Sequence, residues 1–334
     1  MKLLILGGTR FLGRHVAEQA LARGHQLTLL HRGQSGPALF AQAEHRLADR
    51  DGDLGALAQG EWDAVIDTSA YFPRQVRALA ACLAGRVGHY QLVSSISAYA
   101  ATDAPGTAED AALQTLADPE VQAVTGETYG GLKAACEAVA QAGFAGHCLI
   151  NRPGLLVGPH DPTGRFTWWV RRITAGGDVL APGDPLGPVQ FIDARDAAAW
   201  MLLQAEQRTL GSFNLTGPAQ PLTWGALLQS AVSALNPLAR LQWVDEAFVL
   251  AQGVAPWSDL PVWLPRASAG MLQVAIGRAL ATGLQCRPLP ETLRDTAVWD
   301  QAAPAAPASG PPRPSVGLTP EREAALLAAW RARA

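Results

Sequence analysis

Apolar residues in the first half of the chain form short runs that alternate with segments of helical spacing. Runs of strand length occur at residues 2–6, 26–30, 64–66, 90–93 and 147–151. Between them, apolar side chains recur every three or four residues from position 11 onward, at 75–83 and at 129–141. Strands that alternate with helices in this way pair side by side as a parallel sheet with helices on both faces. We therefore predict an α/β fold with a doubly wound parallel sheet.

The first strand and the first helix are joined by a glycine-rich turn within the segment KLLILGGTRFLGR. Gly7 and Gly13 are six residues apart, with Arg10 midway. Glycine permits turn angles that a Cβ forbids and lets a phosphate approach the backbone, and the helix N-terminus supplies free N–H groups. The turn thus predicts a nucleotide-binding unit, although a glycine turn without a ligand is the alternative for this motif alone. An ATPase phosphate loop is not expected, because Arg14-His15 stand where that motif needs Lys-Ser or Lys-Thr.

The pattern changes after Arg152-Pro153, where prolines and glycines become frequent. Helical spacing then covers 166–173, 194–204 and 223–234, and short apolar runs occur at 189–192 and 212–215. We predict that residues 1–153 form a nucleotide-binding domain, to which the chain returns near 189–216. Residues 154–300 are expected to form a smaller mixed domain that binds substrate as a lid, with Trp168 and Trp169 in its core.

Two C-terminal segments stand out by their composition. Residues 302–315, AAPAAPASGPPRPS, form a Pro/Ala linker that has no means of packing a core. Residues 319–333 begin with Thr-Pro-Glu, which is an N-cap followed by proline at the first helical position. Leu326, Leu327 and Trp330 give this helix an apolar face, so we expect it to dock on another surface.

Composition narrows the class of function. A hydrophobic share of 49% and a charged share of 16% suit a well-buried soluble enzyme, and the net charge of −3 gives no support for nucleic-acid binding. The four cysteines have neither metal nor redox spacing, so we interpret them as reduced thiols and predict no metal site. The N-terminal apolar run is too short for a signal peptide, and no run approaches membrane-spanning length. We therefore expect a cytoplasmic protein without a membrane partner.

One predicted helix carries a phenol and an ammonium group on the same face. Tyr129 and Lys133 are four residues apart, which is about one helical turn. Lys2 and Lys133 are the only lysines of the chain, and a lysine offers a compact charge that arginine does not reproduce. An exposed helical pair without chemistry is the alternative. Together with the glycine turn and the serines that follow the strand at 90–93, the pair favours a catalytic site.

These motifs occur in an order that resembles the short-chain dehydrogenase/reductase superfamily. The resemblance rests on the glycine turn, on Ser94-Ser95 and on Tyr129-x3-Lys133. The length and the segments NRPGLLVGP and QFIDARD are similar to the extended branch, the NAD-dependent epimerase/dehydratase family. The form GGTRFLG resembles atypical members of that branch, some called reductases and others chloroplast stem-loop RNA-binding proteins. The resemblance covers roughly residues 1–300 and implies a Rossmann-type fold.

The resemblance implies a Ser-Tyr-Lys catalytic site and a set of cofactor contacts. Tyr129 would be the general acid/base, Lys133 would lower the pKa of Tyr129 and hold the nicotinamide ribose, and Ser95 would polarise the carbonyl. Asp49 and Arg50 match an adenine-contacting pair, and Pro153 matches a residue that packs on the nicotinamide. The full set of implied cofactor contacts is Gly7, Thr9, Arg10, Phe11, Leu12, Gly13, Arg32, Asp49, Arg50, Thr68, Ser69, Ala70, Ser94, Tyr129, Lys133 and Pro153.

Further residues are expected near the substrate. The predicted substrate contacts are Ser97, His160, Arg165 and Gln190. For Asp193 and Asp196 we favour capping of the helix that follows them over substrate binding. Nucleotide-sugar dehydratases place Asp-Glu directly after the catalytic hydroxyl, whereas this chain has Ile96-Ser97 there. Dehydration of that type is therefore not expected.

The end of the second predicted strand bears on the choice of cofactor. NAD-preferring members of the family carry an acidic residue there for the ribose hydroxyls, whereas this chain reads Leu-His-Arg-Gly at positions 30–33. Arg32, helped by Arg10 in the glycine turn, suits a 2′-phosphate, so NADP(H) is favoured and NAD(H) is possible. The alternative is that Arg32 is solvated and Arg10 packs over the adenine.

Three functions remain open at this point. The first is an NAD(P)-dependent reductase or dehydrogenase that acts on an alcohol or carbonyl of a small molecule. The second is a nucleotide-sugar epimerase with tightly bound NAD. The third is a non-catalytic NAD(P)- or RNA-binding protein on the same fold, which the negative charge disfavours. A homodimer formed through the helix at 129–141 is possible for any of them.

Overall fold

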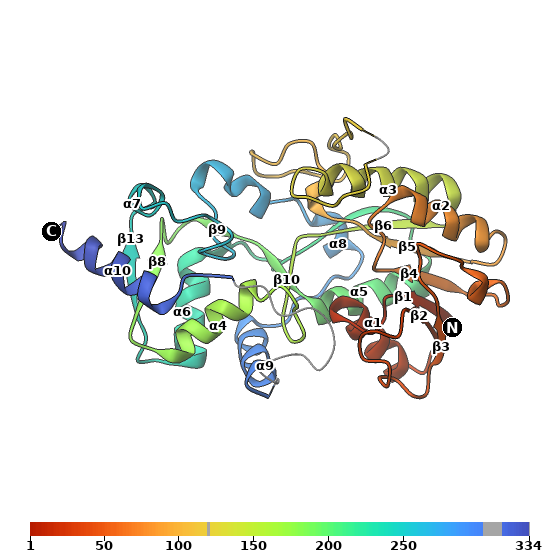
Figure 1. Cartoon of the computed structure of the whole chain (residues 1–334), viewed down its shortest axis with the longest axis horizontal. Helices are drawn as coiled ribbons and strands as arrows, with labels where there is room; N and C mark the ends of the chain where they lie inside the picture. The colour runs from red at the N-terminus through yellow and green to blue at the C-terminus, as the bar shows by residue number, and fades with distance from the viewer. Residues whose placement is uncertain (119–120, 303–315, 334) are drawn as a thin grey trace.

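A computed structural model gives the fold of the chain and describes residues 1–118, 121–302 and 316–333. Figure 1 shows a sheet flanked by helices near the N-terminus and a second, mixed region that includes the last helix. The Pro/Ala linker predicted at 302–315 lies outside the described residues from position 303 onward. Within the described ranges, no helix combines the length and the apolar character needed to cross a lipid bilayer.

Seven parallel strands form the central sheet, in the order β11-β6-β5-β4-β1-β2-β3. Strands of a parallel sheet are covered on both faces and therefore need nearly continuous apolar runs. The first strand meets this requirement, because four of its five residues are buried. The predicted doubly wound α/β sheet is thus confirmed. Its strands are β1 (Lys2–Leu6), β2 (Gln26–His31), β3 (Glu44–Leu47), β4 (Ala64–Asp67), β5 (Tyr90–Val93), β6 (Cys148–Pro153) and β11 (Gly211–Leu215).

Helices cover both faces of the sheet (Figure 1). One face carries α1 (Phe11–Ala22) and α5 (Ala194–Gln207), and the other carries α2 (Pro73–Cys82) and α3 (Tyr129–Gly143). Alternate residues of β1 supply the two cores. Leu3 and Ile5 pack with residues of α1 and α5, whereas Leu4 and Leu6 pack with residues of α2 and α3. Each face of the sheet therefore has its own hydrophobic core.

The second region has a separate core built from short elements. Trp169 is only 2% exposed within this core and Trp168 packs against it, so both tryptophans belong to the core of this region, as predicted. The elements are β7 (Leu155–Val157), α4 (Arg165–Ala175), β8 (Asp178–Pro182), β9 (Pro188–Val189), β10 (Phe191–Asp193), β12 (Leu222–Thr223), α6 (Trp224–Leu235), β13 (Arg240–Val244), α7 (Glu246–Ala251) and α9 (Leu289–Ala302), whereas α8 (Gly277–Ala281) packs on β11 in the core that α1 and α5 cover. Short 3-10 helices occur at η1 (Gly55–Leu57), η2 (Ile96–Ala98) and η3 (Arg266–Leu272).

The last helix, α10 (Pro320–Arg331), docks on this second core. The Thr319 side chain caps it by accepting a hydrogen bond from the Arg322 N–H at 3.2 Å. Glu323 is buried, where it accepts a hydrogen bond from the Leu180 N–H at 2.9 Å and pairs with Arg172. Leu326 and Leu327 belong to the same core. The helix is thus held by a buried ion pair as well as by apolar contacts.

The chain passes between the sheet and the second region at neighbouring strands. Pro153 at the end of β6 pairs in register with Leu215 at the end of β11, and the Gly154 N–H donates to the Leu215 carbonyl at 3.2 Å. At a third crossing, Asp193 caps α5 by accepting from the Arg195 N–H at 2.9 Å, as predicted. Asp196, the second aspartate of that prediction, lies in the first turn of α5, where its carboxylate accepts a hydrogen bond from Arg287 at 2.8 Å.

The glycine turn between β1 and α1 is tightly packed. Gly7 has a φ of +85°, in the region that favours glycine. Gly13 lies in the first turns of α1, and a Cβ added there would lie 2.4 Å from the Gly7 carbonyl oxygen. Only a glycine lets the helix begin this close to the turn.

We expect the Gly13→Ala variant to lower the free energy of unfolding by about 1–3 kcal/mol, because the added methyl group is forced against backbone. Gly126→Ala is the matched control, since Gly126 faces open space with an ordinary φ, and a change within about 0.5 kcal/mol is expected there. Urea unfolding of the two variants measures both values. Equal stabilities would contradict the packing described for the turn.

Candidate active site

The three predicted catalytic side chains come together where the central strands end. Ser95 follows β5, Tyr129 begins α3, and Lys133 lies one turn further along that helix. The Ser95 side chain lies close enough to the Tyr129 phenol to lower its pKa. The Ser95 hydroxyl oxygen also accepts the Ser97 N–H at 3.1 Å, which fixes the start of η2. A hydroxyl and a phenol are therefore positioned to share one polar atom of a bound molecule.

Lys133 is buried beneath this pair. Its Nζ donates to the Ala70 carbonyl at 2.8 Å and to the Val93 carbonyl at 2.9 Å, and the residue is only 3% exposed. Burial disfavours the charged ammonium and lowers the pKa of Lys133 to about 8, although nearby acidic groups oppose the shift. Lys133 therefore titrates close to neutral pH.

The pKa of Tyr129 differs from the sequence-based expectation. We expected Lys133 to lower it, but burial raises the pKa of Tyr129 above its ordinary value, and the nearby Ser95 side chain and the charge of Arg165 only partly oppose this. The Lys133 Nζ lies 5.9 Å from the centre of the Tyr129 ring and donates two hydrogen bonds to backbone carbonyls. Its charge is thus directed at the strand ends more than at the phenol.

The glycine turn suits the pyrophosphate of a dinucleotide. The N-cap residue of α1, Arg10, makes no side-chain cap, and the first turn of α1 contains no acidic residue. Its N–H groups and the positive end of its dipole are therefore available to an anion. Thr68 and Ser69 lie where a Gly7 Cβ would be, and the Gly7 carbonyl lies where a Gly13 Cβ would be, so these glycines let the turn close tightly on itself. The neighbouring residues Thr9 and Leu12 are buried, and Phe11 has a φ of +37°.

The segment after β4 is held by a buried ion pair. Arg50 donates to the two Asp67 oxygens at 2.6 and 2.8 Å and to the Ser69 hydroxyl at 3.0 Å. Thr68 donates from its hydroxyl to the Leu6 carbonyl at 2.7 Å. Arg50 was expected to contact adenine, whereas its guanidinium braces the loop that carries Thr68, Ser69 and Ala70. Asp49 forms a turn by accepting the Asp51 N–H at 3.0 Å.

Two of the predicted cofactor residues, Ser94 and Pro153, are buried, unlike the two arginines that we expected at a 2′-phosphate. Ser94 is buried and its hydroxyl donates to Glu137, so this side chain faces the interior. Pro153 is buried at the end of β6. Arg10 and Arg32 are instead exposed, and no other described residue forms an ion pair or hydrogen bond with either guanidinium.

The predicted substrate residues divide into two groups. Ser97 is half-buried next to Ser95, and Arg165 at the start of α4 stacks on Trp257 at 5.7 Å while its charge acts on Tyr129. His160 packs instead between His15 of α1 and Trp299 of α9, with ring centres 5.6 and 5.4 Å away.

Gln190 has a structural role that the sequence analysis did not anticipate. Its amide donates to the Val274 carbonyl at 3.0 Å and accepts the Val274 N–H at 3.1 Å. A substrate contact by Gln190 would require both bonds to break, because Gln190, between β9 and β10, is bonded here to the segment that follows η3.

Two features of the site carried no signal in our sequence analysis. Tyr71 lies beside Tyr129, with ring centres 6.4 Å apart, although only its place after Ala70 could have drawn attention to it. Behind the catalytic residues, Arg152 donates to Glu137 at 2.7 Å and to the Tyr99 hydroxyl at 3.0 Å. Glu137 follows Lys133 by four residues, so its helical spacing could have placed it on the same face.

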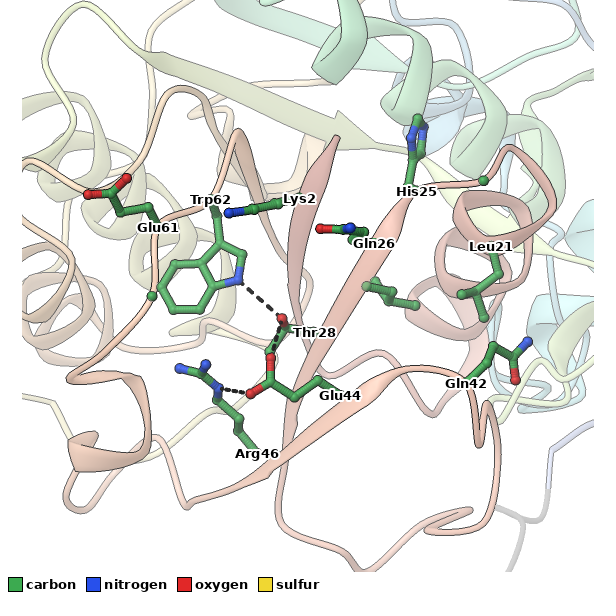
Figure 2. Close-up of a pocket in the computed structure, with 13 residues that line it drawn as sticks. Lys2, Leu21, His25, Gln26, Thr28, Gln42, Glu44, Arg46, Glu61 and Trp62 are labelled. Atoms are coloured by element: carbon green, nitrogen blue, oxygen red, sulfur yellow. Dashed lines mark hydrogen bonds and ion pairs between the residues drawn. The ribbon is translucent and has the colours of Figure 1, made fainter.

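A cavity of about 570 Å³ lies at the other edge of the sheet, where β1, β2 and β3 begin (Figure 2). In Figure 2 the Trp62 ring donates to Thr28 at 3.2 Å, and Thr28 donates to Glu44 at 3.0 Å. Arg46 donates to the same carboxylate at 2.8 Å. These polar groups pair with one another, and none of the predicted site residues lines this cavity.

Comparison with known proteins identifies the class. The sequence model described as the NAD dependent epimerase/dehydratase family matches residues 3–215, which is more than half of the chain. The chain belongs to the NAD-dependent epimerase/dehydratase family, and the resemblance noted from its motifs is confirmed.

Solved structures of similar fold include two sugar-nucleotide epimerases. UDP-glucuronic acid 4-epimerase from Bacillus cereus, solved in complex with NAD, is 15% identical, with a TM-score of 0.64 over 90% of this chain and 99% of that one. UDP-glucose 4-epimerase from Thermotoga maritima, solved with UDP-glucose, is 16% identical, with a TM-score of 0.65 and the same coverage, 90% and 99%. At these identities the likeness shows the fold alone.

One curated relative is named for stem-loop binding and not for an epimerase activity. The chloroplast stem-loop binding protein of 41 kDa b from Arabidopsis thaliana is 26% identical in an alignment of length 235 that covers 65% of this chain and 58% of that protein. The chain thus spans less than two thirds of that relative's length.

We expect Asp67→Asn to lower the free energy of unfolding by about 3 kcal/mol or more, because it leaves the Arg50 charge without its buried partner. Burial alone would raise the pKa of Asp67, but the charge of Arg50 lowers it below the ordinary value. The unfolded chain therefore takes up a proton first as the pH falls. The stabilisation is fully present above the unfolded pKa of about 3.9 and is lost as the pH falls through the folded pKa.

Urea unfolding between neutral and acid pH measures this effect, and the gap between wild type and variant should narrow in acid. Glu291→Gln is the control, since its carboxylate is 50% exposed in an ion pair with Arg287 and should contribute under about 1 kcal/mol. A gap that stays constant to low pH would show that the ion pair is not its source.

Proposed function

We propose that the protein is an NAD(P)-dependent oxidoreductase of the extended short-chain dehydrogenase/reductase type, acting on an alcohol or carbonyl of a small molecule. The observation that carries the proposal is the meeting of the Ser95 and Tyr129 side chains with the buried Lys133 ammonium, beside a glycine turn that suits a pyrophosphate. Hydroxyl, phenol and ammonium groups in this order can bind a carbonyl oxygen and exchange a proton with it.

The residues that would hold the dinucleotide lie along the ends of the strands. The first turn of α1 would bind the pyrophosphate, the loop after β4 would run beneath the cofactor, and Pro153 would face the nicotinamide. Arg10 and Arg32 would bind a 2′-phosphate. When bound, the nicotinamide supplies or accepts a hydride at the reacting carbon.

The side chains of Ser95, Tyr129 and Lys133 would then bind the substrate oxygen and transfer its proton. Ser95 donates a hydrogen bond to the substrate oxygen, and Tyr129 gives that oxygen a proton in the reducing direction or removes one in the oxidising direction. The raised pKa of Tyr129 keeps the phenol protonated, which suits the donor role. Lys133 favours negative charge on the phenol after transfer, because its ammonium lies beneath the site.

The epimerase alternative rests on the similar solved structures, which are nucleotide-sugar epimerases. It uses the same three side chains and differs in keeping its cofactor bound. Two exposed arginines and no carboxylate between Leu27 and Leu39 favour NADP(H) and hence the reductase. Protein purified with firmly bound NAD would reverse this order.

The remaining parts of the proposal concern partners and location. We propose a cytoplasmic homodimer with a small-molecule substrate and no nucleic-acid partner. The net charge of −3 supports the last point, because few phosphates can be neutralised by such a chain. The relative named for stem-loop binding makes RNA the alternative partner.

Tyr129→Phe is expected to lower turnover about 10²–10⁴-fold while leaving cofactor affinity nearly unchanged, because it removes only the transferable proton. Loss of reduced-nicotinamide absorbance with a panel of aldehydes and ketones measures turnover, and tryptophan fluorescence measures cofactor binding in the same samples. Lys133→Ala should impair both quantities. Wild-type turnover in the Phe variant would refute the assignment of Tyr129.

NADPH is expected to bind more tightly than NADH, and Arg32→Ala should reduce NADPH affinity about ten- to a hundredfold while leaving NADH affinity unchanged. The reason is that a guanidinium forms charge-assisted hydrogen bonds with a 2′-phosphate, each worth roughly 1.5–3 kcal/mol. Fluorescence titration of both cofactors provides the test, with Arg77→Ala on the exposed side of α2 as the control. Equal affinities in the wild type would move the epimerase ahead of the reductase.

A further inference from the structure

A second tyrosine lies against the buried lysine of the site. Tyr71 follows Ala70 in the loop between β4 and α2, and its side chain is 44% exposed. Its backbone N–H donates to the Gln75 side-chain oxygen at 2.9 Å, and Gln75 is in turn bonded to Asp51 at 2.9 Å. The loop therefore holds Tyr71 in a defined position even though its ring reaches solvent.

The face of the Tyr71 ring is directed at the Lys133 ammonium. The Lys133 Nζ lies 4.8 Å from the centre of the Tyr71 ring, closer than the 5.9 Å that separates it from the Tyr129 ring. The two carbonyl bonds of Nζ run to Ala70 and Val93, which leaves one N–H for other partners. An ammonium within about 6 Å of an aromatic ring centre is attracted by the negative face of the ring.

We propose that Tyr71 is a positioning residue that acts through Lys133: its ring stabilises the protonated ammonium and keeps it beneath Tyr129. The role in turnover rests on the proposed function, whereas the effect on Lys133 does not. The ring is the active part of the side chain, because no described residue bonds to the Tyr71 hydroxyl.

Because Lys133 is buried, a neutral aromatic ring beside it can change the fraction of its ammonium that is protonated. Burial opposes the ammonium, so that its pKa is about 8, and a modest change in surroundings alters the protonated fraction near neutral pH. The Cys136 thiol nearby is neutral, because burial raises its pKa to about 12. The titratable and charged groups that face Lys133 are Asp67, Arg50, Cys136, Glu137, Tyr71 and Tyr129.

Two of these charges already have stronger partners. Asp67 is paired with Arg50, and Glu137 is paired with Arg152, so neither carboxylate is dedicated to the lysine. Of the two aromatic rings near the ammonium, that of Tyr71 is the nearer one, at 4.8 Å against 5.9 Å for Tyr129.

The lysine content of the chain permits a direct test. Lys2 and Lys133 are the only lysines, so protein labelled with [ε-13C]lysine gives two side-chain signals in an NMR pH titration. Lys2 is exposed at the far edge of the sheet and serves as the internal reference. The titration needs neither substrate nor cofactor, so its result is independent of the proposed reaction.

Three variants separate the ring from the hydroxyl. Tyr71→Leu should lower the pKa of Lys133 by about half a unit to one unit, because the leucine has no negative face. Tyr71→Phe should leave that pKa within about 0.2 units of wild type, since the ring remains. Tyr71→Trp should leave it unchanged or raise it, and this variant keeps the test valid if the leucine protein does not fold. The Lys2 signal should not move in any variant.

A Lys133 pKa that is unchanged in Tyr71→Leu would overturn the proposal, as would an equal drop in the Leu and Phe variants or a drop in the Trp variant. Turnover provides the second readout. If the reductase proposal holds, the alkaline limb of the activity profile of Tyr71→Leu should shift to lower pH with the Lys133 pKa. A shift in the NMR titration without any detectable reductase activity would retain this inference and reject the reaction.

Discussion

A buried ammonium group joins the parts of the chain that make up the site. Lys133 reaches from α3 to the carbonyl of Ala70 after β4 and to that of Val93 at the end of β5. A buried charge without hydrogen-bond partners would be costly, so these bonds fix α3 against the two strand ends. Tyr129 lies one turn earlier on the same helix and takes its position from that constraint. The loop that presents Tyr71 begins at the carbonyl that Lys133 holds.

A buried ion pair repeats this arrangement one turn further along α3. Glu137 accepts hydrogen bonds from Arg152 of β6 and from Ser94 at the end of β5. Tyr129, Lys133 and Glu137 thus follow one another at intervals of one turn on the face that meets the sheet. Breaking one of these pairs would leave a charge in the interior, so the polar contacts restrict where α3 can lie.

The sequence analysis predicted most of the strands and helices whose residues follow a clear apolar pattern. β1 and β5 were expected at their observed bounds, because their residues are buried on both faces. The edge strand β3 reads Glu-His-Arg-Leu and is partly exposed, so its bounds carried no apolar signal. In the second region, β8 and β13 were missed because they pair with each other across 62 residues, and a local pattern does not reveal such a pairing.

Only the site residues that belong to local sequence motifs could be predicted from the sequence. Ser95, Tyr129 and Lys133 meet at the strand ends because parallel strands bring their carboxyl ends to one edge. The bonds of Gln190 to Val274 and of Arg50 to Asp67 could not be foreseen, because residue type alone does not show that a backbone segment or a carboxylate occupies a side chain. Tyr71 has no motif of its own, and its closeness to Lys133 depends on the path of a loop.

The in-register ends of β6 and β11 restrict how the second region can move over the sheet. The chain leaves the sheet at Pro153 and again at Leu215, and the Gly154–Leu215 hydrogen bond ties these exits together. Sliding one exit past the other would break that bond and shift a strand within a packed sheet. Rotation about a line through the two exits would leave that bond intact, but it would break the ion pair between Arg195 of α5 and Asp295 of α9 beside the third crossing at Asp193. The second region is therefore held over the sheet at three crossings, which fixes Arg165 of α4 where its charge acts on Tyr129.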